Sequence, residues 1–518
     1  MMRTRTIGPN ARTPFCSWSN RFLIAAIAGI VFLTLFPFRF ALPNLPGQAP
    51  PFLLGGSLKT AGWFDALLNV ALFVPFGFGL AEKLREDKKS RASTFFIVLA
   101  SGTLFSYSIE LAQAYIPMRD SGWEDVVTNS TGSVMGFLLY ELLGTAIVGF
   151  LTRCEIAISS WITLQRAAVL VSIYFALWFG LSGLLQRDSR LSNWDPESSF
   201  FVGNEATGQS AWKGRILEVQ IWDRAIPDEI ARRLSSGESL GAAQAGALAS
   251  YEFSGAPPFK DVEQFLPVLS WTPSPPAHSE SNAVVLGGKS WLSSAAPVTN
   301  LIERMQKSNQ FSVHLICAPG ETRDGTGHII SISRVRPGAP PLAPPLSDLT
   351  IRQEESNLVL WFRSPLSVRR SILAWYVPNV FTDGRLRNIH YSYDGADLSL
   401  HIDGEKVARN YRLGPGSALA QLLRSVRPSE LDGYTDIYYT LLFFPAGILF
   451  GIVARRETRS SAMGLAVLAL GLALAALLLE WILVAVSGRS LLSEHVVLAL
   501  CVLAAGSIWF NADRWART

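Results

Sequence analysis

The chain has 518 residues, of which 49% are hydrophobic and 17% are charged, and its formal net charge is +4. This length predicts more than one domain, and the mean hydropathy of +0.26 indicates a membrane protein that also has a more polar part. No block of basic residues is present, which argues against a nucleic-acid partner.

Several apolar stretches are long enough to cross a membrane as helices. Five of them precede a long polar region and three follow it. The spans are expected at residues 22–40, 64–82, 94–116, 126–150, 162–185, 434–453, 462–486 and 491–511. The sequence therefore predicts a multi-pass α-helical membrane protein with a tail at 1–21, a membrane domain at 22–185, an inserted domain at 186–433 and a second membrane segment at 434–518.

Lysine and arginine residues predict the orientation of these spans, because cytoplasmic loops carry an excess of both. Basic residues gather in the N-terminal tail, in the connections after spans two, four and six, and at the C-terminus. We therefore expect both termini in the cytoplasm and residues 186–433 outside a bacterial inner membrane. A cleaved signal peptide is the alternative for the first span, although its apolar run is long for one.

Spans two to four carry polar residues that a bilayer should reject, spaced so that neighbours share a helix face. They are Asp65, Asn69, Glu110, Gln113, Arg119, Asp125 and Asn129. In the orientation above, all of them fall at the outer ends of their spans or in the turn between spans. This convergence supports the orientation independently of the charge count.

The spacing of these residues resembles the pattern of VanZ-like membrane proteins. That pattern reads Asp-x3-Asn-x3-Phe-x-Pro-x-Gly, then Glu-x2-Gln, Arg and Asp-x3-Asn-x2-Gly-x3-Gly, and it lies here within residues 63–151. Its remaining members are Phe73, Pro75, Gly77, Gly132 and Gly136. The family is named for teicoplanin resistance and its general biochemistry is poorly defined, so the resemblance implies a class and a site rather than a reaction.

Two interpretations of the polar residues stay open. In the first they bind a polar or anionic head group, with Arg119 holding a phosphate or carboxylate by two hydrogen bonds. In the second they are a structural network in which Arg119 pairs with Glu110 or Asp125. A catalytic version of the first gives Glu110 and Asp125 acid and base roles, and we favour binding over catalysis. Four residues of the pattern are given structural roles, in a helix kink and in close helix packing. They are Pro75, Gly77, Gly132 and Gly136.

The last three spans resemble spans two to four at an offset of 370 residues, as Pro75 and Pro445 illustrate. The matching residues are Phe443, Pro445, Gly447, Glu480, Arg489 and Gly506. The substituted positions are Thr435, Tyr439, Leu483, His495 and Ala499. We infer a parallel duplication whose second copy, at 434–518, has lost part of its polar set. The alternative is three unrelated spans. Glu480 is expected to contact Arg489, although a pH-sensitive pair of Glu480 with His495 is also considered.

The inserted region, 186–433, consists of short apolar runs separated by turn residues, which is typical of an all-β sandwich. Residues 390–407 (HYSYDGADLSLHIDGEKV) resemble paired strands of the concanavalin A-like, laminin-G-like family, and residues 201–234 resemble its terminal phrase. The opening phrase (YEFSGAPPFKD, 251–261) comes after the terminal one. The resemblance therefore implies a circularly permuted domain with 235–250 as the linker.

This domain also contains candidate ligand contacts. Its aromatic residues Trp222, Trp361, Trp375 and Tyr376 could stack on sugars, although aromatics at strand spacing are more often core. The acidic residues Asp394, Asp397 and Asp403 could bind calcium, although Asp-Gly turns explain them more simply. No cofactor or other metal is predicted.

Together these features favour a cell-envelope membrane protein. Its outer domain would bind glycan or an envelope component, and its polar membrane residues would meet lipid-linked or amphiphilic ligands. One alternative is an enzyme that acts on a lipid- or polyprenyl-linked saccharide through Glu110 and Asp125. Another is a scaffold whose sandwich binds an envelope protein.

Overall fold

The computed structural model describes residues 18–35, 63–116, 122–238, 246–255, 257–275, 282–322, 325–340, 343–369, 374–407, 411–423, 431–456 and 462–515. The chain forms two compact units. The first comprises Met1–Ile173, Leu441–Ala473 and Ala499–Thr518, and the second comprises Tyr174–Thr440 and Leu474–Leu498.

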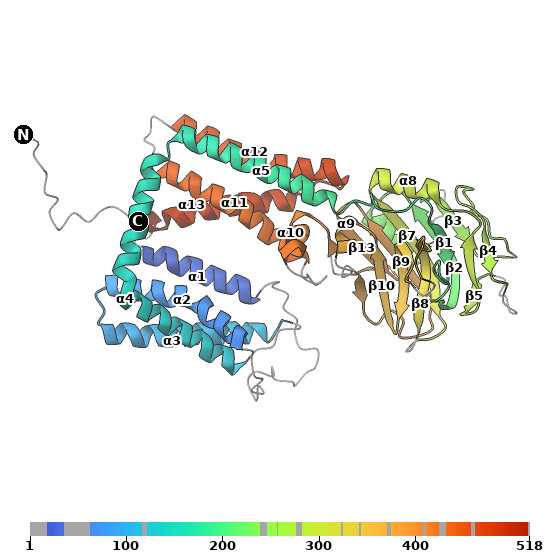
Figure 1. Cartoon of the computed structure of the whole chain (residues 1–518), viewed down its shortest axis with the longest axis horizontal. Helices are drawn as coiled ribbons and strands as arrows, with labels where there is room; N and C mark the ends of the chain where they lie inside the picture. Colours follow the sequence, from blue (N-terminus) through green and yellow to red (C-terminus); the bar gives the residue numbers. More distant parts are fainter. Residues whose placement is uncertain are drawn as a thin grey trace, which may run out of the picture. The chain divides into compact units, whose positions relative to one another are not determined.

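Eight helices among the described residues are long and apolar enough to cross a membrane. They are α1 (Trp18–Leu35), α2 (Trp63–Glu86), α3 (Arg91–Gln113), α4 (Trp123–Trp161), α5 (Leu164–Arg187), α11 (Leu431–Arg456), α12 (Ala462–Ser487) and α13 (Ser493–Trp515) (Figure 1). The predicted multi-pass helical class is confirmed. Helix α4 has 39 residues, whereas the sequence predicted its end near residue 150. Residues 150–161 contain no glycine or proline to end the helix, and about 20 residues suffice to cross a bilayer.

Helices α2 and α4 of the first unit touch through their backbones. A Cβ atom added at Gly77 would lie 1.9 Å from the carbonyl oxygen of Ser133, and one added at Gly136 would lie 2.2 Å from that of Val74. Gly132 faces the backbone of Val70 in the same way. These glycines therefore bring the two helices closer than larger side chains would allow. Pro75 lies inside α2.

Helices α11 and α13 meet through corresponding positions. A Cβ atom added at Gly447 would lie 2.2 Å from the carbonyl oxygen of Leu503, and one added at Gly506 would lie 2.5 Å from that of Phe444. Each of these residues stands 370 positions after its counterpart in α2 or α4. The two helix pairs thus pack through the same positions of the sequence pattern.

A buried ion pair joins further helices of the first unit. The guanidinium of Arg21 on α1 donates to both carboxylate oxygens of Glu155 on α4, at 2.9 and 3.1 Å, and to the carbonyl oxygen of Phe510 on α13 at 3.1 Å. Arg455 on α11 lies 3.5 Å from the same carboxylate. Because Arg21 is only 1% exposed, removing Glu155 would leave a charge buried without its counterion.

The second unit contains an antiparallel β-sandwich, which confirms the predicted all-β insertion (Figure 1). One sheet has the strand order β11-β10-β9-β8-β1-β6-β4 and the other β14-β13-β12-β7-β2-β3, with β15 paired to β13 and β5 to β2. The strands of the first sheet are β1 (Ser199–Val202), β4 (Leu269–Thr272), β6 (Trp291–Ser294), β8 (Thr326–Arg334), β9 (Leu346–Glu354), β10 (Asn357–Phe362) and β11 (Trp375–Val377). Those of the second are β2 (Lys213–Trp222), β3 (Ala249–Glu252), β5 (Val284–Gly287), β7 (Phe311–Pro319), β12 (Arg387–Tyr393), β13 (Asp397–Ile402), β14 (Glu405–Lys406) and β15 (Tyr411–Arg412).

An aromatic cluster lies between the two sheets. Phe311 of β7 contacts Phe362 of β10 with ring centroids 5.6 Å apart, and Tyr391 and Tyr393 of β12 join them. Because side chains alternate along a strand, the residues next to these core positions face away from the opposite sheet. The unit also contains the short helices α6 (Asp228–Ser235), α8 (Thr299–Ser308), α9 (Pro365–Arg369) and α10 (Pro415–Leu423).

The sandwich is bonded to the end of α12 within the second unit. The side-chain amide of Asn309 donates to the carbonyl oxygen of Ser487 at 2.6 Å, and that of Gln310 donates to the carbonyl oxygen of Gly488 at 2.7 Å. A Cβ atom at Gly395 would lie 2.3 Å from the carbonyl oxygen of Ser487, and Gly395 has a φ of 103°. This contact therefore requires glycine both for space and for backbone conformation.

The glycine contacts give a stability prediction. Gly136→Ala should lower the free energy of unfolding by roughly 1–3 kcal/mol, because the new methyl group collides with backbone that cannot rotate away. Gly149→Ala on the same helix is the matched control, since nothing lies within 4 Å of its added Cβ atom. The control should be neutral or stabilising by up to about 1 kcal/mol, because alanine favours helix. Unfolding of both variants in detergent measures the difference, and equal stability would contradict the packing role.

Candidate functional site

Two of the predicted polar residues meet between α2 and α4. The side-chain amide of Asn69 donates to the carboxylate of Asp125 at 2.6 Å. The bond lies near the contact of Gly132 with Val70, since Val70 follows Asn69 directly on α2 and Gly132 lies about two turns after Asp125 on α4. Close backbone approach therefore holds an amide and a carboxylate together at the start of α4.

Glu110 and Gln113 of α3, and Asn129 of α4, form hydrogen bonds with backbone groups or with a serine hydroxyl. The Glu110 carboxylate accepts from the backbone N–H of Gly122 at 3.0 Å, just before α4 begins. The Asn129 amide donates to Ser106 of α3 at 3.0 Å, and the Gln113 amide donates to the carbonyl oxygen of Thr34 of α1 at 3.0 Å. Glu110, Gln113 and Asn129 are all buried. These direct bonds connect α1, α3 and the start of α4.

Two of the seven predicted polar residues lie partly or wholly outside the residues that the structure describes. Arg119 is outside the described residues, and the side chain of Asp65 is as well, although its backbone belongs to α2. The hydrogen bond of Asn69 with Asp125 joins two of the seven residues directly. Gln113 and Asn129 instead bind residues that the pattern does not contain.

A second polar cluster lies in the second unit, at the ends of α11, α12 and α13. The Glu480 carboxylate accepts from the guanidinium of Arg489 at 2.6 Å, from the hydroxyl of Tyr439, and from Nδ1 of His495 at 3.0 Å. Glu480 is fully buried. The predicted contact of Glu480 with Arg489 is confirmed, and the pair with His495 forms beside it.

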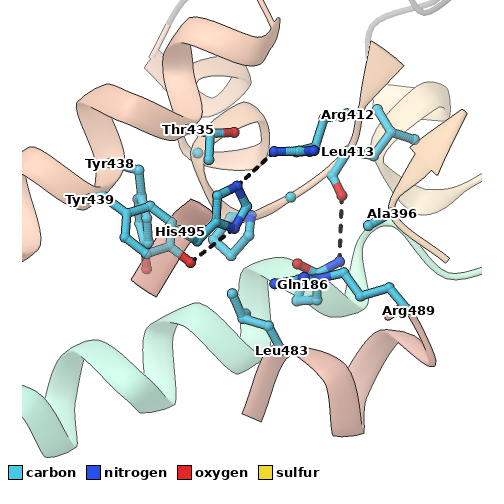
Figure 2. Close-up of a pocket in the computed structure, with 13 residues that line it drawn as sticks. Gln186, Ala396, Arg412, Leu413, Thr435, Tyr438, Tyr439, Leu483, Arg489 and His495 are labelled. Atoms are coloured by element: carbon cyan, nitrogen blue, oxygen red, sulfur yellow. Dashed lines mark hydrogen bonds between the residues drawn. The ribbon is translucent and has the colours of Figure 1, made fainter. Parts of the chain in front are cut away.

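His495 forms contacts through both of its ring nitrogens. Nη1 of Arg412, on β15 of the sandwich, lies 2.7 Å from Nε2 of His495 (Figure 2). Nδ1 of the same ring lies 3.0 Å from the carboxylate of Glu480 on α12. His495 is therefore held between a membrane helix and the sandwich by one ring nitrogen on each side.

Arg412 keeps its charge through acidic neighbours. It donates to both carboxylate oxygens of Asp397, at 2.6 and 3.0 Å, and lies 3.1 Å from Glu494. Burial by itself would lower the pKa of Arg412, but these carboxylates outweigh burial and raise that pKa. The sequence pattern missed Arg412, because nothing in a two-residue strand indicates which helix it meets.

A small pocket opens among these groups (Figure 2). Its polar lining side chains are Gln186, Arg412, Thr435, Tyr438, Tyr439, Arg489 and His495. Both arginines are already paired with carboxylates, and Nε2 of His495 is already bonded to Arg412. The arrangement therefore acts as a link between sandwich and helices rather than as an open anion site or a free general base.

The two polar clusters correspond in sequence position. Tyr439 and His495 stand 370 residues after Asn69 and Asp125. The hydroxyl of Tyr439 lies 3.4 Å from Nδ1 of His495, so both helix triplets bring the same two positions into contact. Glu480, at the position corresponding to Glu110, is likewise buried.

The aromatic candidates of the sandwich separate into two groups. Trp222 and Trp375 are buried, so they belong to its packed parts. Trp361 is half-buried, and Tyr376 is 47% exposed. Tyr376 stands opposite Val359, two residues before Trp361, so Trp361 and Tyr376 share one sheet face. The four residues thus do not form one platform, but two of them share a face.

The three acidic candidates serve turns and ion pairs. Asp394 accepts from the backbone N–H groups of Ala396 and Asp397 at 3.0 and 2.7 Å. Asp397 binds Arg412, and Asp403 accepts from the backbone of Asn388 at 2.9 Å. Within the described ranges, no three histidine, cysteine or acidic residues are grouped so that they could hold a metal ion.

The link through His495 predicts an energetic coupling. A double-mutant cycle of Arg412→Ala and His495→Ala should give a coupling of about 0.5–3 kcal/mol, because the two side chains share a hydrogen bond in a closed network. Glu494 is the matched control partner, since its side chain is 64% exposed. Its coupling to Arg412 should be at most about 1 kcal/mol. Unfolding followed by fluorescence measures both cycles, and equal couplings would contradict the link.

Comparison with known proteins gives a match in the N-terminal part of the chain. Residues 20–144 match the family model described as VanZ/LLP1, which is about a quarter of the chain. No curated protein and no solved structure matches the chain. The matched range includes Asn69, Glu110 and Asp125 and the glycine contacts of α2 with α4. The match and the eight candidate spans together support a membrane protein of the cell envelope with a VanZ/LLP1-like region at residues 20–144.

Proposed function

We propose that this protein binds the polar head group of an amphiphilic or lipid-linked ligand at the polar residues of α2, α3 and α4. The observation that carries the proposal is the hydrogen bond of Asn69 to Asp125, held by close backbone packing within the VanZ/LLP1-like region. Polar side chains in a span are costly and usually serve a function. Arg119 supplies the positive charge of this site, for a phosphate or carboxylate of the ligand.

The proposed site faces the outside of a bacterial inner membrane. The distribution of lysine and arginine supports this orientation, with both termini in the cytoplasm and the sandwich outside. Arg21, Glu155 and Arg455 then lie at the cytoplasmic ends of their helices, where charged side chains reach the interface most easily.

The proposal includes a duplicated membrane unit. The matched glycine contacts and the corresponding pairs Asn69–Asp125 and Tyr439–His495 support descent of both helix triplets from one ancestor. In this interpretation the first copy keeps the ligand site. The second copy has exchanged its polar residues for a link to the sandwich through Arg412.

The sandwich is proposed to bind glycan or another envelope component, as a permuted concanavalin A-like domain. Strand β2, from the terminal phrase, pairs with β3, from the opening phrase, which is the neighbourhood that a permutation requires. Trp361 and Tyr376 share one sheet face and supply rings for stacking on sugar. Binding by the full-length protein on a glycan array, lost in Tyr376→Ala and Trp361→Ala, tests this part.

The head-group site predicts an effect of Asp125→Asn. The new side chain keeps an oxygen that can accept from Asn69, so the protein should fold, but it loses the charge that a head-group hydroxyl or amine would meet. Native mass spectrometry of the protein from its own membrane should show at least a roughly tenfold loss of retained amphiphile, the size expected for a charged hydrogen bond. Arg119→Ala should also reduce the amount of amphiphile that the protein retains.

Glu124→Gln is the matched control, because Glu124 neighbours Asp125 on α4 but lies outside the pattern. It should retain the amphiphile. If Asp125→Asn instead fails to accumulate, or destabilises the protein as much as Asn69→Ala does, then the network is structural and the binding proposal is wrong.

The orientation predicts which side of the membrane is labelled. After replacement of the natural cysteines, Leu386→Cys in the exposed part of the sandwich should react with a membrane-impermeant maleimide in intact spheroplasts, because a charged reagent does not cross the bilayer. Lys88→Cys in the exposed α2–α3 connection should react only after permeabilisation. The reverse pattern would place the sandwich in the cytoplasm.

A further inference from the structure

Three histidines form a row across the second sheet of the sandwich. His390 of β12 stands directly opposite His314 of β7 on one side and His401 of β13 on the other. Tyr391, the neighbour of His390 along β12, belongs to the aromatic cluster between the sheets. The row therefore faces away from the opposite sheet. We call His314, His390 and His401 the histidine row.

Helix α6 covers this face of the sheet. It packs on β12, β13 and β14, and its residue Leu234 is buried with Trp222 and Ile226. The ring of Trp222 lies 5.7 Å from that of His390. The three histidines are consequently only 3%, 0% and 2% exposed in chain order. The solvent reaches the row only if α6 moves.

Several ring nitrogens of the histidine row have no hydrogen-bond partner among the described residues. Among the described residues there is no partner for Nδ1 of His314, for either ring nitrogen of His390 or for Nδ1 of His401. Buried polar atoms usually have partners, and a charged group costs far more to bury than a neutral one. The closed arrangement therefore tolerates neutral imidazoles and opposes protonated ones.

The charges around the row do not offset this cost at its centre. Asp228 of α6 lies 3.9 Å from His401, but Lys406 of β14 binds the same carboxylate at 2.5 Å. On β2, the residue opposite His314 is the neutral Gln220, which donates to Glu218. The remaining charged side chains of α6 are exposed, and Arg232 pairs with Glu229.

The pKa values of the row agree with the geometry. Burial lowers the pKa of His314 to about 4. Burial and the two neighbouring histidines lower the pKa of His390 well below its ordinary value. Burial also lowers the pKa of His401, although Asp228 opposes the change. Once α6 has moved away, the histidines regain ordinary pKa values near 6.5.

We propose that the histidine row makes the attachment of α6 acid-labile, so that protons drive α6 off the sheet. A lowered pKa in the closed state means that the open state binds more protons, so closure is fully stable above about pH 6.5 and weakens as the pH falls toward 4. Opening exposes Trp222, Ile226 and the sheet face beneath them. The sandwich thereby acquires a surface in acid that it does not present at neutral pH.

Hydrogen exchange of the full-length protein tests this inference. After correction for the intrinsic exchange rate, the opening constant of α6 should rise about 30-fold between pH 8 and pH 5 for His314 alone, given pKa values of about 4 and 6.5. Helix α8, on the same sandwich, should not change. An unchanged α6, or an equal rise in α8, would overturn the proposal, since the second result would indicate general unfolding.

Substitutions locate the effect. His314→Gln should reduce the pH response of α6 by about 30-fold, and His390→Gln should also reduce it, because glutamine does not titrate. His328→Gln is the matched control, since burial also lowers the pKa of His328 to about 4, but this residue lies on β8 of the other sheet. The control should keep the full response. If the opening constant of α6 depends on pH in His314→Gln and His390→Gln as it does in the wild type, the histidine row does not control the attachment of α6.

Discussion

Hydrocarbon provides no hydrogen bonds, so each polar group that a membrane helix carries must find its partner inside the protein. Three pairs in the described helices illustrate this requirement: Asn69 with Asp125, Asn129 with Ser106, and Arg21 with Glu155. Such bonds require helices that approach closely and in a fixed register. The glycines of α2 and α4 supply both, because their backbones touch at Gly77 and Gly136.

The same requirement has a different outcome in the last three helices. There the buried carboxylate of Glu480 is bonded to Arg489, Tyr439 and His495, and the outer ring nitrogen of His495 bonds to Arg412 of the sandwich. A polar group in a helix thus becomes an attachment point for a β-domain. Similar packing of helices therefore surrounds a buried polar pair in one place and a domain junction in another.

Much of this architecture could be predicted from the sequence. Apolar runs located the helices, turn residues located the strands, and the spacing of Glu480 and Arg489 across one helix end predicted their contact. Partners that are far apart in the chain could not be predicted, because the register of strands and the docking of domains depend on the whole fold. Arg412 with His495, and the opposed histidines of β7, β12 and β13, belong to this second class. The end of α4 was also missed, since no residue type marks it.

The contact of the sandwich with α12 has a consequence for biosynthesis. Residues 186–433 leave the ribosome before Ser487 and Gly488, whose carbonyl oxygens receive Asn309 and Gln310. The β-domain can therefore complete its own sheets early, but it can form its bonds with the end of α12 only after the seventh membrane helix has been made. Assembly of the second unit thus finishes from the C-terminal side, and a nascent protein interrupted before residue 487 would carry a folded domain that is joined to α5 but lacks its bonds to α12.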